Sequence, residues 1–84
     1  MATGEGELEA SVFAIMARVL NVAPESINAE TSPDTLASWD SLAHMNLVLA
    51  LEEELAVQFT EAQIVDMLNA QLIVLAVAEA RAKS

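Results

Sequence analysis

The sequence of 84 residues has no cysteine, only three basic residues, one histidine, two glycines and two prolines. Without cysteine, the chain has neither a disulfide framework nor a thiolate metal site, a usage that fits a reducing compartment. One histidine excludes a histidine metal cluster. Three basic residues against 13 acidic ones give a formal net charge of −10. That charge argues against nucleic acid as a partner, because phosphate contacts need clustered Lys and Arg.

Long apolar runs are also missing. The most apolar run, residues 72–78, is far too short to span a bilayer. The acidic, polar start, residues 1–7, lacks the basic region and apolar core of a signal peptide. We therefore expect a soluble, cytoplasmic, monomeric protein with no membrane partner. Its negative charge should steer basic surfaces of other proteins toward it.

The length fits one domain, residues 1–84, and 55% of the residues are hydrophobic, enough for a shared core. Apolar residues recur at helical spacing near the start and predict a first helix over about residues 7–20; they are Leu8, Val12, Ile15, Met16 and Val19. Residues 21–40 show no clean period and predict a long ordered loop with at most one short turn. Loops of this length inside a compact domain usually have a function.

Capping signals predict three further helices. Asp40 suits the N-cap of a helix over about residues 41–55. Thr60 and Gln63 form a capping box that opens a short helix over about residues 61–68. Asn69 is a plausible cap for a last helix over about residues 70–82, although the last two helices could form one kinked helix. No strand-like alternation is present, so the predicted fold class is all-α.

The predicted helix over residues 41–55 carries two apolar stripes. At about 100° per residue, one stripe lies roughly 130–150° from the other. The first consists of Leu47, Val48, Leu51 and Leu55, and the second of Leu42, Met45 and Leu49. A surface helix needs one stripe for its own core, so the second indicates a partner, for which methionine is an adaptable contact. A central helix that buries both stripes explains the pattern equally well.

Three glutamates, residues 52–54, follow these stripes. Such a run is more often only solvated surface. Here Glu52 and Glu53 also flank the second stripe, so they are candidates for the rim of a docking surface.

Ser41 follows the long loop and an acidic cap, at the start of the predicted helix. A phosphate ester on its hydroxyl would face free backbone N–H groups and the positive end of the helix dipole. Serines at helix starts are, however, mostly structural. The tripeptide Asp-Ser-Leu alone is therefore a weak signal, and the surrounding sequence has to decide.

That surrounding sequence resembles the signature of the phosphopantetheine-dependent acyl carrier proteins. The specific part covers residues 39–55: Trp39-Asp40-Ser41-Leu42, then Met45, then the run from Leu47 to Leu55. Compatible positions extend the resemblance from about Leu8 to Ala80; they include Pro24-Glu25-Ser26-Ile27, Thr31, Leu36, Phe59-Thr60 and Ile64.

The resemblance implies a four-helix bundle of acyl-carrier type, with 4′-phosphopantetheine from coenzyme A attached to the Ser41 hydroxyl, beside Asp40. It also implies docking of the phosphopantetheinyl transferase at Asp40, Leu42 and Met45. The thiol of the arm would hold cargo as a thioester and present it to acyl-loading and acyl-processing enzymes with basic docking surfaces. Such a protein is a carrier and not an enzyme. Leu49, Glu52 and Glu53 complete the expected docking residues.

Three positions depart from the fatty-acid-synthesis carriers that the chain resembles. Ser38 replaces their usual glycine, and Ala43 and Asn46 replace acidic residues. The pattern indicates a specialised stand-alone type II carrier in a polyketide, hybrid peptide or modified-acyl pathway. Two alternatives stay open: an aminoacyl or peptidyl carrier, and an unmodified helical module that binds a protein through the second stripe.

Two other residues attract attention. We expect His44 to be a half-buried imidazole bonded to the long loop, with the alternative that it lines the entrance for the arm or cargo. We expect Trp39 to anchor the loop on the core. Ser41 and His44 lack the remaining machinery of a catalytic triad, and the acidic residues lack the spacing of an EF-hand. No catalytic or metal site is therefore predicted.

Overall fold

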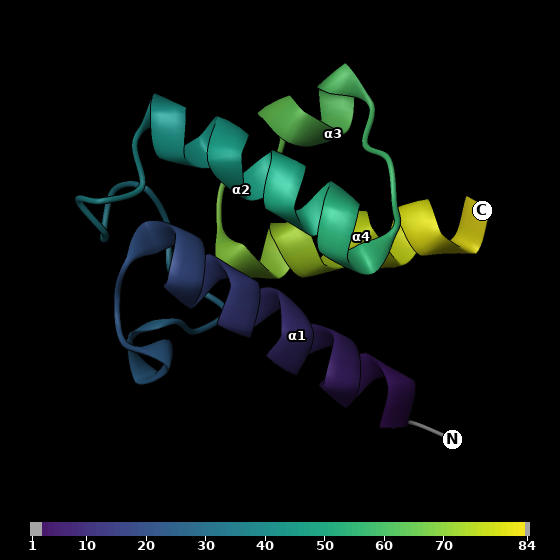
Figure 1. The fold of residues 1–84 in the computed structure, drawn as a ribbon, viewed down its shortest axis with the longest axis horizontal. Helices are drawn as coiled ribbons and strands as arrows, with labels where there is room; N and C mark the ends of the chain where they lie inside the picture. Colours follow the sequence, from purple (N-terminus) through teal and green to yellow (C-terminus); the bar gives the residue numbers. More distant parts are fainter. Residues whose placement is uncertain (1–2, 84) are drawn as a thin grey trace.

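Four α-helices and one short 3₁₀-helix make up the fold (Figure 1). The computed structural model describes residues 3–83, and this range contains no strand. The elements are α1 (Thr3–Leu20), η1 (Pro24–Ser26), α2 (Ser41–Leu55), α3 (Glu61–Val65) and α4 (Ala70–Lys83). The predicted all-α fold class is confirmed. Among the described residues, none of the helices combines the length and the apolar character needed to cross a membrane.

The core lies where α1, α2 and α4 meet. α1 packs against both α2 and α4, while the short α3 lies beside them on the outside (Figure 1). Each long helix contributes fully buried side chains at helical spacing, as an amphipathic helix should. The largest are Val12, Met16 and Leu20 of α1, Leu47, Val48 and Leu51 of α2, and Ile73 and Val77 of α4.

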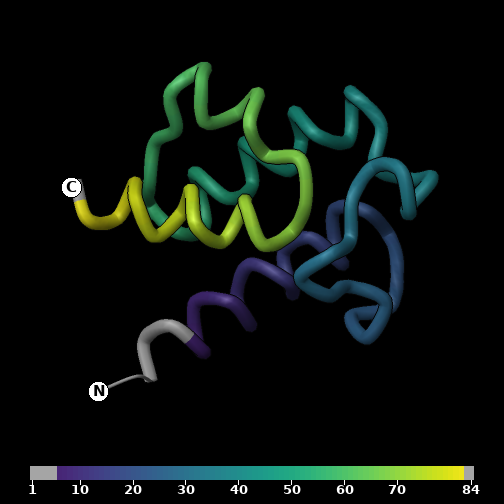
Figure 2. Tube along the Cα trace, turned by 180° about the vertical axis from the view of Figure 1, so that it is seen from behind, coloured from purple at the N-terminus to yellow at the C-terminus, as the bar shows by residue number. Residues whose placement is uncertain are grey.

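The loop from α1 to α2 is ordered by its own hydrogen bonds and by contacts with α4. Asn21 has a left-handed backbone (φ 59°) and ends α1, a common role for asparagine. The loop then places Ile27 and Trp39 in the core. In the view from behind, the loop passes the start of α4 (Figure 2).

The first turn of α4 shows how closely that loop is joined to the bundle. The backbone N–H of Ala70 donates to Thr31 O at 2.8 Å, and that of Gln71 donates to Ala29 O at 3.0 Å. The next N–H, of Leu72, donates to Asn69 Oδ1 at 2.8 Å, so Asn69 is the cap that the sequence indicated. Groups that a helix start normally leaves unpaired are therefore satisfied by the loop and the cap.

The helix ends differ from expectation in two places. α1 begins at Thr3 instead of about residue 7. It includes Gly4 and Gly6, which lower helix propensity but do not interrupt the helix. α3 ends at Val65 instead of about residue 68, and α4 is a separate helix. The side chain of Met67 is buried in the core. To place the Met67 side chain in the core, the backbone leaves the helical path after α3.

Asn69→Ala should lower the free energy of unfolding by about 1 kcal/mol, the usual loss for a removed N-cap side chain. Urea denaturation followed by circular dichroism measures the change. Gln71→Ala, an exposed position in the same turn, is the control and should change stability by less than about 0.5 kcal/mol. Equal stability of the two variants would contradict the assigned capping role.

Candidate functional site

Ser41 is the first residue of α2 and is exposed. The residue before it, Asp40, has an extended backbone, and its Oδ1 accepts a hydrogen bond from the Ala43 N–H at 2.8 Å. The predicted N-cap is confirmed. Because Asp40 caps the helix, the Ser41 hydroxyl is not required for that structural role. This answers the main objection to a functional serine at a helix start.

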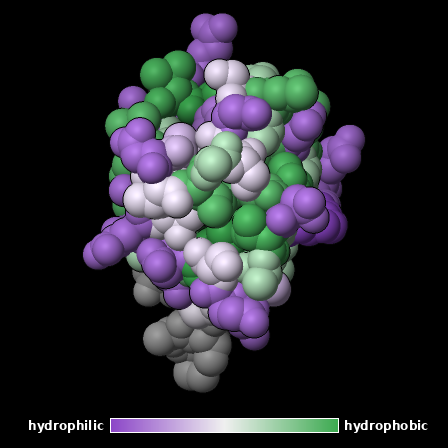
Figure 3. Space-filling model, turned by 90° about the vertical axis from the view of Figure 1, so that its left-hand side faces the viewer, coloured by the Kyte–Doolittle hydropathy of each residue, from purple (hydrophilic) through white to green (hydrophobic). Residues whose placement is uncertain are grey.

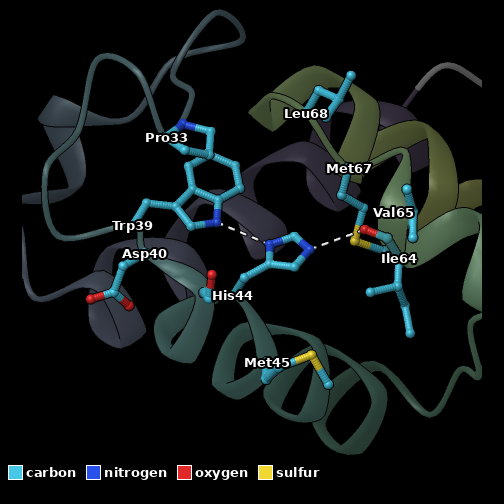
Figure 4. A pocket seen from close by; sticks show the side chains of 10 residues that line it. Pro33, Trp39, Asp40, His44, Met45, Ile64, Val65, Met67 and Leu68 are labelled. Carbon is cyan, nitrogen blue, oxygen red and sulfur yellow. Dashed lines mark hydrogen bonds between the residues drawn. The ribbon is translucent and has the colours of Figure 1, made fainter.

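A cavity of about 550 Å³ opens beside Ser41, between the end of the loop, the first turns of α2, and α3 (Figure 4). Its walls include five residues that the sequence had marked as noteworthy: Trp39, Asp40, Ser41, His44 and Met45. The other five come from the loop and from α3 and the turn after it, and were not anticipated: Pro33, Ile64, Val65, Met67 and Leu68. The lining is mostly apolar, so the cavity suits an apolar ligand.

His44 connects the two sides of this cavity (Figure 4). Its Nδ1 accepts a hydrogen bond from Trp39 Nε1 at 3.0 Å, and its Nε2 lies 3.0 Å from Ile64 O. The indole N–H only donates, so Nδ1 must carry a lone pair and the imidazole hydrogen must be on Nε2. His44 therefore donates to the Ile64 carbonyl at the end of α3.

The first expectation for His44 is confirmed, and its alternative role at the entrance for the arm or cargo stays a prediction. The ring is half-buried and bonded to a loop residue, Trp39, and it also lines the cavity. Trp39 is only 2% exposed and anchors the loop on the core, as predicted. The bond from His44 to α3 was not predicted.

The two apolar stripes of α2 differ in burial. Leu47, Val48 and Leu51 are buried, and Leu55 is half-buried against the core. The second stripe is exposed: Leu42 by 72%, Met45 by 49% and Leu49 by 55%. α2 is thus a surface helix, and the alternative in which it buries both stripes is wrong. Val65 and Leu68 continue the exposed apolar surface beyond α2.

Figure 3, which views the end of the molecule at the left of Figure 1, shows apolar side chains at the surface among polar ones. Apolar groups exposed together and rimmed by polar residues commonly mark a contact site. The exposed stripe therefore needs an explanation beyond folding.

The three glutamates at the end of α2 differ in their surroundings. Glu52 is half-buried, and its Oε2 accepts a hydrogen bond from the Phe59 N–H at 3.1 Å, so it orders the chain after α2. Glu53 is exposed. Glu54 pairs with Arg18 of α1. The hydrogen bond and negative charge of Glu54 raise the pKa of Arg18. Sequence reasoning missed the structural role of Glu52, because its partner belongs to the next loop.

Within the part of the chain that the structure describes, no group of three or more His, Cys, Asp or Glu side chains could hold a metal ion. The site consists instead of an exposed serine at the start of a helix, an apolar cavity beside it, and an apolar surface on the same helix. This arrangement suits covalent attachment of a group with an apolar cargo.

Comparison with known proteins decides the family. The family model described as a phosphopantetheine attachment site matches residues 10–76. The chain belongs to this family. It is therefore a carrier protein and not a catalyst, and its cofactor is covalently attached 4′-phosphopantetheine.

The carrier is also similar to a solved structure. The solution NMR structure of a holo acyl carrier protein from Geobacter metallireducens matches with a TM-score of 0.81 and 25% sequence identity. The match covers 99% of this chain and 90% of the other. The acyl-carrier type of bundle is thus confirmed. The search of curated proteins found no match.

The imidazole of His44 should carry its hydrogen on Nε2 in the folded carrier, because only this tautomer satisfies both Trp39 and Ile64. The ¹⁵N chemical shifts of the two ring nitrogens in a long-range ¹H–¹⁵N spectrum distinguish the tautomers. A Trp39→Phe variant removes the donor at Nδ1 but keeps the Ile64 carbonyl, so the share of the Nδ1–H form should rise while the Nε2–H form stays the major one. A dominant Nδ1–H form in the wild type would contradict the hydrogen-bond assignment.

Proposed function

We propose that Ser41 is the attachment residue and that the carrier holds acyl intermediates there for presentation to partner enzymes. The observation that carries the proposal is the Ser41 hydroxyl: it belongs to an exposed residue at the first position of α2, relieved of capping by Asp40 and next to an apolar cavity. When bound, 4′-phosphopantetheine supplies a thiol that holds the acyl group as a thioester.

The residues around Ser41 fit such a group. The start of α2 offers backbone N–H groups and a positive dipole end, which suit a phosphate ester on Ser41. Asp40 fixes the start of the helix, and its carboxylate is turned toward the Ala43 N–H and away from the cavity (Figure 4). The cavity offers apolar walls to the rest of the group and its cargo.

The docking surface for partner enzymes consists of Asp40, the exposed stripe of Leu42, Met45 and Leu49, and the carboxylates of Glu52 and Glu53. Apolar contacts supply affinity at the centre of an interface, and charges at the rim guide the encounter. With a net charge of −10, the carrier attracts basic partners and repels a second copy of itself. These partners are the phosphopantetheinyl transferase and acyl-loading and acyl-processing enzymes, met by a monomer in the cytoplasm.

The pathway is a specialised one, for a polyketide, a hybrid product or a modified acyl group. The first half of α2 has no acidic residue, and Ala43 and Asn46 stand where fatty-acid-synthesis carriers have carboxylates. Enzymes that recognise those charges would find only neutral groups here. The partner surfaces must therefore rely more on the apolar stripe.

Intact-mass analysis tests the attachment residue. After incubation with coenzyme A and a broad-specificity phosphopantetheinyl transferase, the wild-type protein should gain the mass of one phosphopantetheine unit. Ser41→Ala should gain none, because the accepting hydroxyl is absent. An unchanged wild-type mass would favour the rival function, an unmodified module that binds proteins through α2.

The docking stripe is tested by Leu42→Ala, which should lower kcat/KM of the transferase by about tenfold, the effect of losing one well-placed apolar contact. Leu75→Ala is the control: Leu75 is exposed by 55% but lies on α4. It should leave kcat/KM nearly unchanged. Equal effects of the two substitutions would show that the stripe on α2 has no special part in docking.

A further inference from the structure

α3 is the shortest of the four α-helices. It has five residues, and none of its side chains is buried. A helix of this length is not stable in isolation. Its position therefore depends on the groups that attach it to its neighbours.

Two hydrogen bonds, together with the packing of the half-buried Ile64 side chain against the core, hold α3 against its neighbours. Its N-terminus is closed by the capping box of Thr60 and Gln63. Gln63 Nε2 also donates to Glu79 Oε1 at 2.9 Å, which joins α3 to α4. On the side of the cavity, His44 Nε2 donates to Ile64 O at 3.0 Å, which joins α3 to α2. The Ile64 carbonyl also accepts the Met67 N–H at 3.4 Å, so the bond from His44 adds a link from α2 to a carbonyl that closes the end of α3.

We propose that His44 is a positioning residue for the cargo. Through the Ile64 carbonyl it holds α3 in place as the wall of the cavity beside Ser41, so that an apolar acyl group lies against Ile64 and Val65 and is shielded from water. The inference rests on the proposed function, because it assumes that cargo is attached at Ser41.

Trp39 orients the imidazole of His44 for its hydrogen bond to the Ile64 carbonyl. Its indole is buried in the core, so its N–H has a fixed position, and the rings of Trp39 and His44 are stacked with centroids 6.0 Å apart. Because this N–H occupies Nδ1, His44 presents its own hydrogen only at Nε2, toward α3. The loop, α2 and α3 are thereby joined at the cavity by a single chain of hydrogen bonds.

Two amide substitutions separate the two bonds of His44. In His44→Asn, the short side chain brings its amide close to the position of Nδ1, so an acceptor for Trp39 is kept but Ile64 is out of reach. In His44→Gln, the longer side chain brings an N–H close to the position of Nε2, so the donor to Ile64 is kept. Asn46→Ala, at an exposed position of α2, controls for substitution on this helix.

The first measurement is amide hydrogen exchange of the unmodified protein by NMR. His44→Asn should speed exchange of the Ile64 and Asp66 amides by about fivefold to tenfold, the change expected for loss of one hydrogen bond. Core amides of α1 and α4 should keep their rates. His44→Gln and Asn46→Ala should resemble the wild type.

The second measurement is protection of the cargo. The transferase loads Ser41 from acetyl- or octanoyl-coenzyme A, forming the phosphodiester at Ser41 Oγ and releasing adenosine 3′,5′-bisphosphate. Cleavage of each thioester by hydroxylamine is compared with that of the same acyl-coenzyme A. The octanoyl group should be protected relative to acetyl in the wild type and in His44→Gln. His44→Asn should lose this protection.

Several results would overturn the inference: no protection in the wild type, equal protection in His44→Asn, or equal defects in both amide variants. If His44→Asn does not fold, His44→Ala serves in its place, since it also removes the donor to Ile64 and should weaken protection. If the transferase leaves Ser41 unmodified, the proposed function fails. Amide exchange in the unmodified protein then still decides whether His44 holds α3.

Discussion

The burial of Trp39 is the constraint on which the site depends. The indole lies in the core directly before the cap of α2, so it fixes the point at which the long loop ends and the helix begins. Ser41 follows two residues later and inherits that position. The same indole orients His44, and His44 bonds to α3. One aromatic side chain in the wall of the cavity thus helps to position both the serine and the short helix.

The exposed stripe of α2 is a consequence of how the helices share the core. α1 covers the side of α2 that carries Leu47, Val48 and Leu51, and these side chains share one core with residues of α4. α3 is too short to cover the other side, so Met45 and Leu49 stay at the surface. A longer third helix would stabilise the fold by burying more apolar surface, but it would cover the exposed stripe of α2 next to Ser41. The bundle therefore leaves uncovered a surface that the proposed function needs.

Much of the fold could be predicted from the sequence because the signals are local. The caps Asp40, Thr60 and Asn69 bond to residues within three positions, and the buried residues of α1 and α2 recur at helical spacing. The remaining features depend on residues that are distant in the chain. His44 bonds to a carbonyl 20 residues away, and the burial of Met67 ends α3 early. The cavity walls from α3 and the following turn could have been suspected only from apolar residues, Val65 and Leu68, in a segment too short to bury them.

The electrostatic potential differs between the two ends of α2. Its first turns are neutral, while three carboxylates crowd its last turn, where the helix dipole is already negative. In the proposed docking, a basic surface is attracted first to the end of α2 remote from Ser41, and short-range apolar contact then brings it over the hydroxyl. The glutamate end of α2 would orient the partner at long range, and the apolar residues near Ser41 would align it on contact. Added salt would accordingly weaken the first more than the second, because screening acts on charges and not on apolar contact.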